Sequence, residues 1–281
     1  MNEIRNKVKE LLDNNEIDVL LAWREDPGNK DARPHVFKKG DDLSAVVFDE
    51  RCIDNLTKYI PRLTRRYKKV GILLKGCDGR SLVTQLVEHR VEKNKVMALA
   101  VACNGVKING KEAEKCADCA THVSPVADHV FGERKKEEKP EFKTLAQIEA
   151  MSPEERWKFF SEHFARCTRC YACRQICPLC YCEICIVDQQ EPKWIEPSAK
   201  LSANTMWLLV RAYHLAGRCS DCGECERVCS EGIPLRLLNI ALEKGVLEMF
   251  KKRPGTMPDE LPPLVVLSKD DPDTILEAKH E

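Results

Sequence analysis

The sequence lacks an excess of charge of either sign, because 45 lysines and arginines stand against 45 aspartates and glutamates. Net charge therefore gives no general attraction to nucleic acid or to an anionic membrane surface. Long apolar runs are also missing: the longest uncharged apolar stretches, such as residues 96–103, are far shorter than the roughly 20 residues of a membrane-spanning helix. The N-terminal stretch MNEIRNKVKELLDNNE has no apolar signal core. We therefore expect a cytoplasmic protein with no membrane span and no nucleic-acid partner.

A G-x-G-x-x-G motif after a strand, which marks the standard dinucleotide site, is absent as well. Cysteine, by contrast, is abundant, with 16 in 281 residues. The cysteines occur in C-x2-C steps without an export signal, so reduced, metal-binding thiolates fit the pattern better than disulfides. At four thiolates per cube, these cysteines allow at most about four [4Fe–4S] clusters.

Two cysteine runs share the spacing C-x2-C-x2-C-x3-C, namely CTRCYACRQIC from Cys167 and CSDCGECERVC from Cys219. In two-cluster ferredoxins, three closely spaced thiolates hold one [4Fe–4S] cube and the fourth cysteine of the run binds the other cube. The spacing therefore predicts two crossed ligand sets: Cys167, Cys170, Cys173 and Cys229 for the first cluster, and Cys219, Cys222, Cys225 and Cys177 for the second. Zinc also binds four thiolates from C-x2-C pairs, but the unbroken spacing, present twice, favours iron–sulfur clusters.

The remaining cysteines fall into smaller groups. One group can converge on a third centre, either a [4Fe–4S] cluster or zinc, or can consist of buried thiols and a loose C-x2-C loop: Cys77, Cys103, Cys116 and Cys119. Another group follows Cys177 closely and supplies possible additional ligands: Cys180, Cys182 and Cys185. These three thiols can form a site together with a further cysteine such as Cys116 or Cys119, or they can pack as small apolar side chains. Cys52 is interpreted as a buried or idle thiol.

The first part of the chain alternates strands with helices. Buried strands are predicted at residues 19–22, 70–74 and 96–101, and helices at residues 2–15, 53–67 and 81–91. This alternation predicts an α/β domain with a parallel or mixed sheet over residues 1–131. The glycine turn that holds Cys77 follows strand 70–74, at the strand end where open α/β sheets place their sites.

The second part of the chain is predicted to be helical. Residues 132–151 begin with a densely charged stretch that cannot bury a core, so they are predicted to form a linker. Helices are expected to begin at Ser152-Pro153, near Ser202 and at Pro234. The chain is therefore expected to be α+β overall, with a helical two-cluster domain at residues 152–252 and an extended tail at residues 253–281.

The motifs resemble those of two known families. The stretch CTRCYACRQICPLCYCEIC, with the later HLAGRCSDCGECERVCSEGIPLRLLN, resembles dicluster iron–sulfur proteins, and the long segment between the runs is similar to that of the heterodisulfide reductase small subunit, an α-helical ferredoxin. The stretch KGCDGRSLVTQLVEHR, with Cys103 and Cys116-x2-Cys119, resembles the beta subunits of deazaflavin-coenzyme hydrogenases and formate dehydrogenases. Together the resemblances cover about residues 65–245.

These resemblances imply a subunit that relays single electrons within a cytoplasmic, anaerobic oxidoreductase complex. Its partners would be a flavoprotein, a hydrogenase, a formate dehydrogenase or a heterodisulfide-reductase-like subunit. We expect two [4Fe–4S] clusters, a third [4Fe–4S] cluster or zinc, and no catalytic residue. Some relatives bind FAD, so the alternative is a flavin-binding oxidoreductase subunit that reduces a small cofactor through its N-terminal domain.

Overall fold

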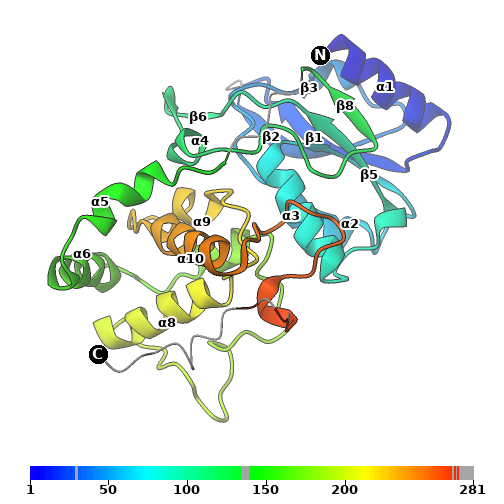
Figure 1. The fold of residues 1–281 in the computed structure, drawn as a ribbon. Helices are drawn as coiled ribbons and strands as arrows, with labels where there is room; N and C mark the ends of the chain where they lie inside the picture. The colour runs from blue at the N-terminus through cyan, green and yellow to red at the C-terminus, as the bar shows by residue number, and fades with distance from the viewer. Residues whose placement is uncertain (29–30, 134–138, 268, 270, 272–281) are drawn as a thin grey trace.

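A computed structural model describes residues 1–28, 31–133, 139–267, 269 and 271. Its first part is built on a six-stranded mixed sheet with the order β2-β1-β4-β5-β8, in which β3 also pairs with β1 (Figure 1). Neighbours among β1, β4, β5 and β8 run parallel, and β2 and β3 run antiparallel to β1. The strands are β1 (Val19–Glu25), β2 (Ala32–Lys38), β3 (Val46–Val47), β4 (Val70–Leu74), β5 (Val96–Val101) and β8 (His129–Phe131). The predicted mixed sheet is thus confirmed.

The sheet is covered on both faces, because all five residues of β4 are buried. Helices α1 (Asn2–Asp13) and α3 (Gly76–Val87) lie on opposite sides of the sheet (Figure 1). Shorter elements complete this part: η1 (Leu43–Ala45), η2 (Leu56–Tyr59), α2 (Ile60–Leu63), η3 (Lys93–Lys95), the β6 (Lys107–Ile108) and β7 (Lys111–Glu112) ribbon, and α4 (Glu114–Ala117).

In the second part, all regular elements of the described residues are helices, and a long irregular segment separates α7 from α8. Its elements are η4 (Lys143–Leu145), α5 (Ala146–Glu149), α6 (Pro153–Ala165), α7 (Ala172–Ile176), α8 (Leu201–Tyr213), α9 (Glu224–Arg227), α10 (Leu235–Phe250) and η5 (Pro263–Val265). Phe164 of α6, Trp207 of α8 and Leu235 of α10 share one buried cluster. Ser152 caps α6 as predicted, and its hydroxyl accepts a hydrogen bond from Glu155 N at 3.2 Å.

Three local expectations need correction. The helix expected at residues 53–67 is shorter and consists of η2 followed by α2. The helix expected at residues 81–91 begins earlier, at Gly76, so Cys77 lies in its first turn and not in an open turn. The stretch expected to be a linker contains η4 and α5, whose Leu145 and Ile148 pack against α10. The domain boundaries themselves stay a prediction, and residues 134–138 and 272–281 lie outside the described part.

Buried polar contacts join the sheet-bearing part to the helical part, and Figure 1 shows α3 next to this junction. Arg80 of α3 is 2% exposed and forms an ion pair with Glu243 of α10 at 2.8 Å. Gln85 Nε2 donates to the carbonyl of Pro178 at 2.9 Å, and Lys58 Nζ donates to that of Cys177 at 3.2 Å. A buried guanidinium needs such a partner, because an isolated charge is costly to remove from water. No helix in the described part is both long and apolar enough to span a bilayer.

Candidate metal centres

The first predicted ligand set gathers around α7. Cys167 follows α6, Cys173 lies in α7, and Cys229 follows α9, so three separate elements bring these thiols together. Burial raises the pKa of the Cys173 thiol, and the neighbouring Cys167, Cys229 and Cys170 raise it further. Cys170 is exposed. The fourth cysteine of the second run thus lies beside the first run.

The second set shows the reciprocal arrangement. Burial raises the pKa of Cys225 to about 12, and the nearby Cys177 and Cys222 add to this shift. The pKa of Cys222 is raised to about 12 for the same reason, again with Cys177 as a neighbour. Burial likewise raises the pKa of Cys219, and Cys222 adds to it. Cys177 therefore lies among the thiols of the second run, and ligation itself stays a prediction.

Both runs share an unusual backbone conformation. The second residue after the first cysteine is left-handed in each run, with φ of 61° at Arg169 and 53° at Asp221. Two residues later the same conformation returns, with φ of 58° at Tyr171 and 71° at Gly223. A left-handed conformation costs a non-glycine residue roughly 1–2 kcal/mol. Three non-glycine residues adopt it here, so contacts from outside the loops must hold them in this shape.

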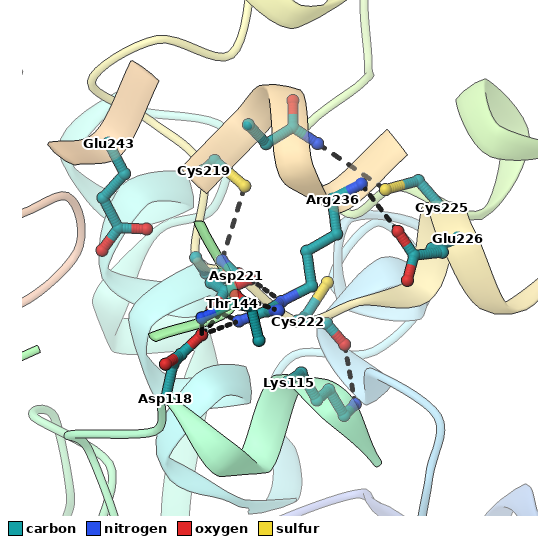
Figure 2. Close-up of polar contacts among 12 residues, drawn as sticks. Lys115, Asp118, Thr144, Cys219, Asp221, Cys222, Cys225, Glu226, Arg236 and Glu243 are labelled. Atoms are coloured by element: carbon teal, nitrogen blue, oxygen red, sulfur yellow. Dashed lines mark hydrogen bonds and ion pairs between the residues drawn. The ribbon is translucent and has the colours of Figure 1, made fainter. Parts of the chain in front are cut away.

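Asp221 shows how the second loop is held. Its carboxylate forms an ion pair with Arg236 of α10, at 2.6 Å between Oδ1 and Nε (Figure 2). Arg236 also forms an ion pair with Asp118 at 3.3 Å, and its backbone N donates to Glu226 at 3.0 Å. Since Asp118 lies next to Cys119, one buried arginine connects the second run to the loop that carries the third predicted set.

The third set lines a cavity of about 220 Å³ beyond the carboxyl ends of β4 and β5. Its thiols come from the first turn of α3, from the residues after β5, and from α4 and the loop that follows: Cys77, Cys103, Cys116 and Cys119. Burial raises the pKa of Cys103, and Cys116 and Cys119 raise it further. The four thiols predicted for a third centre therefore face one space.

Two glycines allow this close assembly. A Cβ atom on Gly76 would lie 1.7 Å from the carbonyl oxygen of Thr121, and one on Gly79 would lie 2.1 Å from Ser124 Oγ. Neither glycine has a positive φ. Their role is therefore not the sharp turn that the sequence suggested, but the direct contact of α3 with the segment after Cys119.

Two buried cations border the thiol sets. Lys115 lines the Cys77 cavity, and its Nζ donates to the carbonyl of Cys222 at 2.7 Å (Figure 2). Arg211 of α8 is 3% exposed, and its Nη2 donates to the carbonyl of Cys173 at 3.2 Å. Burial favours the neutral form of both, but the pKa of Lys115 is raised by Cys77 and Cys222, and that of Arg211 by Cys225 and Cys177.

Sequence reasoning missed both cations. Each depends on thiols that are distant in the sequence, so no local pattern of residues marks it. Asp78, by contrast, only caps α3: its carboxylate accepts a hydrogen bond from Lys75 N at 3.1 Å and forms an ion pair with Lys75 Nζ at 3.0 Å. This agrees with a capping role rather than a role in chemistry.

The other cysteines lie elsewhere. Cys180, Cys182 and Cys185 line a separate cavity of about 200 Å³, whereas Cys116 and Cys119 lie with Cys77. The structure therefore does not bring Cys116 or Cys119 to the trio, which was one of the open alternatives. Cys52 is completely buried in the core beside the sheet, and burial raises its pKa to about 12.

Two of the cysteine groups, that of Cys77 and that of Cys180, line cavities. Within the described ranges, no group of three or more His, Cys, Asp and Glu side chains is arranged to hold a single metal ion. Zinc would need its thiolates about 2.3 Å from one ion. A [4Fe–4S] cube presents its irons at separate corners, each with its own thiolate.

Comparisons with known proteins give a partial match. No protein-family model matches the chain. Among curated proteins, the F420-dependent formate dehydrogenase subunit beta of Methanocaldococcus jannaschii is 32% identical over 111 residues. The similarity covers 39% of this chain and 27% of that protein. The chain thus matches about a quarter of the length of this relative.

Proposed function

We propose that the protein is an electron-transferring subunit of a cytoplasmic, anaerobic oxidoreductase complex, with two [4Fe–4S] clusters on its crossed cysteine sets. The observation that supports the proposal is that Cys177 packs in one cluster with Cys219, and Cys229 in another with Cys167 and Cys173. Bound cubes would supply single-electron oxidation and reduction. The chain supplies the thiolates, excludes water by burial, and compensates negative charge with buried cations.

A third centre at the Cys77 cavity extends the proposed relay. The order that we propose follows the two cations. Arg211 contacts the Cys173 carbonyl of the first set and lies near Cys177 and Cys225 of the second. Lys115 contacts the Cys222 carbonyl of the second set and lines the cavity of the third. Each cation stabilises the added negative charge of a reduced cluster, because Coulomb attraction is stronger in a poorly hydrated interior. The third set thus lies at one end of the series and the first set at the other.

The printed name of the relative supports the class of complex. A formate dehydrogenase subunit beta belongs to an oxidoreductase, and the match covers part of this chain. We therefore propose that the partners are other subunits of a redox complex, such as a formate dehydrogenase, a hydrogenase, a flavoprotein or a heterodisulfide-reductase-like subunit. A separate catalytic role for this chain is not needed for the relay.

Iron and acid-labile sulfide analysis of anaerobically prepared protein tests the proposal. Each centre should contribute about four irons and four sulfides per chain. Replacing Cys177 with serine should reduce the content of both dicluster sets, since the crossed ligand connects them, whereas Cys52→Ala should leave it unchanged. Iron without sulfide, or zinc in its place, would refute the proposal. Stoichiometric FAD or FMN would instead favour the flavin-binding alternative.

A further inference from the structure

A second cysteine-lined cavity is not used by the three centres above. It measures about 200 Å³ and lies between the segment after Cys177 and the side of α8. Three thiols and one imidazole line it: Cys180, Cys182, Cys185 and His214. All three cysteines are free, and Cys182 and His214 are exposed. The cavity therefore combines four potential iron ligands with access from solvent.

The charges around the cavity call for a negative occupant. Three arginines line it together with the carboxylates of Glu183 and Asp188. Arg174 forms an ion pair with Asp188, and Arg218 forms one with Glu88 outside the cavity. Arg211 has no such partner among the residues that the structure describes, and its buried Nε has no hydrogen-bond partner there. A buried cation is costly unless anions lie near it. Arg211 lines this cavity together with Cys180, in addition to bordering the first two thiol sets.

The arrangement fits a cube better than the other occupants of a thiol site. Zinc would need these donors about 2.0–2.3 Å from one ion, whereas a cube binds one donor at each of its separate corners. The cavity is nearly as large as the one at Cys77, at about 200 Å³ against about 220 Å³. Three cysteines leave one iron of a cube without a thiolate, and imidazole is a known replacement for thiolate in iron–sulfur clusters.

We propose that Cys180, Cys182, Cys185 and His214 hold an additional [4Fe–4S] cluster, which exchanges single electrons between the second centre and a redox centre of a docked partner protein. This inference rests on the proposed function. The transfer is balanced. One electron leaves the second centre, which is oxidised by one unit, and reduces the additional cluster. The additional cluster then passes this electron to the partner's centre and returns to its oxidised state. Cys180 provides the short path, because it lies three residues after Cys177, a proposed ligand of the second set, and its backbone N donates to the Cys177 carbonyl at 3.4 Å.

Substitution of the exposed Cys182 tests the cluster. In full-length, anaerobically reconstituted protein, Cys182→Ser should lose about four irons and four sulfides relative to wild type, while the control Cys52→Ala loses none. A Cys182→Ser protein with wild-type iron and sulfide overturns the inference. So does a wild-type protein with sulfide for three centres only, which leaves the proposed function standing. A wild-type protein without sulfide overturns both.

His214 is tested separately. Because its side chain is exposed, substitutions at this position should not disturb folding. Pulsed EPR of reduced protein carrying ¹⁵N-labelled histidine should show a nitrogen coupling that disappears in His214→Ala. His214→Cys should lose the coupling as well but keep the wild-type iron content, because it supplies a fourth thiolate. A coupling that persists in His214→Ala overturns the ligand role of His214.

Discussion

Replacing Gly76 with alanine should disrupt the third predicted centre before any other part of the protein. The added Cβ would lie 1.7 Å from the Thr121 carbonyl oxygen and 2.6 Å from its carbonyl carbon. Both are backbone atoms, so no side-chain rotation can relieve the overlap. The first turn of α3 and the segment at Thr121 must move apart, and these two segments carry Cys77 and Cys119.

The expected cost follows from the severity of the overlap. Adding a methyl group to a closely packed site typically destabilises a protein by about 1–3 kcal/mol. Because the overlap in Gly76→Ala is with backbone atoms, we expect a destabilisation at the upper end of this range, about 3 kcal/mol. For a protein of this size the midpoint of thermal unfolding should then fall by roughly 6–12 °C. The third centre should lose its iron, since its thiols no longer surround one cavity.

The assay compares Gly76→Ala with Gly245→Ala in anaerobic protein. Gly245 lies in α10 with the nearest atom to its added Cβ at 4.0 Å, so alanine fits there and favours the helix by about 1 kcal/mol. We expect Gly76→Ala to lose about four irons and thermal stability, and Gly245→Ala to lose neither. A Gly76→Ala protein with wild-type iron content and unfolding midpoint would refute the close-approach argument.

Three further perturbations act on charge. Arg211→Gln should lower the midpoint potentials of the first two centres by up to about 90 mV in an EPR-monitored redox titration, taking a charge about 8 Å away at an effective dielectric constant of about 20. Glu243→Gln should destabilise the protein by about 3–5 kcal/mol in chemical denaturation, since it leaves buried Arg80 and Arg253 without their carboxylate. The pKa of His35 is lowered from 6.5 by burial and then by Arg24, so the folded state binds fewer protons than the unfolded state. Stability should therefore fall as pH drops below about 6.5, and less so in His35→Gln.

Matched variants make these outcomes decisive. The control for Arg211→Gln is Arg65→Gln, because Arg65 is exposed. It should leave the midpoint potentials of the centres unchanged. An equal shift of these potentials in Arg211→Gln and Arg65→Gln would contradict the role of Arg211. Glu10→Gln removes the exposed ion pair with Lys7 and should change stability by less than about 1 kcal/mol. If Glu243→Gln were no worse than Glu10→Gln, the buried pair would not hold the two parts together. An identical pH profile of stability for wild type and His35→Gln would rule out His35 as the cause of the loss of stability at low pH.

Local patterns were sufficient for the strongly apolar elements. The bounds of β4 and β5 match the predicted strands, because both are short, apolar, almost completely buried runs. Strand β2 was missed because ARPHVFK contains proline and charged residues, and only Ala32 and Phe37 are buried. Strand β8 has three residues, too few for any periodicity. Such edge strands are fixed by pairing with a neighbour, which a single sequence does not display.

The candidate site divides in the same way. Cysteine spacing predicted which thiols belong together, because ligand geometry is encoded in short intervals. It could not predict that Lys115 and Arg211 lie between the thiol sets, since their burial depends on long-range packing. Nor could it predict a left-handed backbone at Arg169 or Tyr171, residue types that do not favour that conformation. These features follow from tertiary contacts alone.

The contacts of Arg80, Gln85 and Lys58 across the junction bear on how fast the proposed relay runs. All three bind backbone carbonyls within or beside the cysteine runs, at Cys219, Pro178 and Cys177. These hydrogen bonds hold the cysteine runs against the part of the chain that carries the third predicted set. Electron tunnelling between centres that are held in place requires no diffusive motion of domains. The rate of electron transfer within the protein should therefore be independent of solvent viscosity. Any viscosity dependence of turnover would then arise where partner proteins meet.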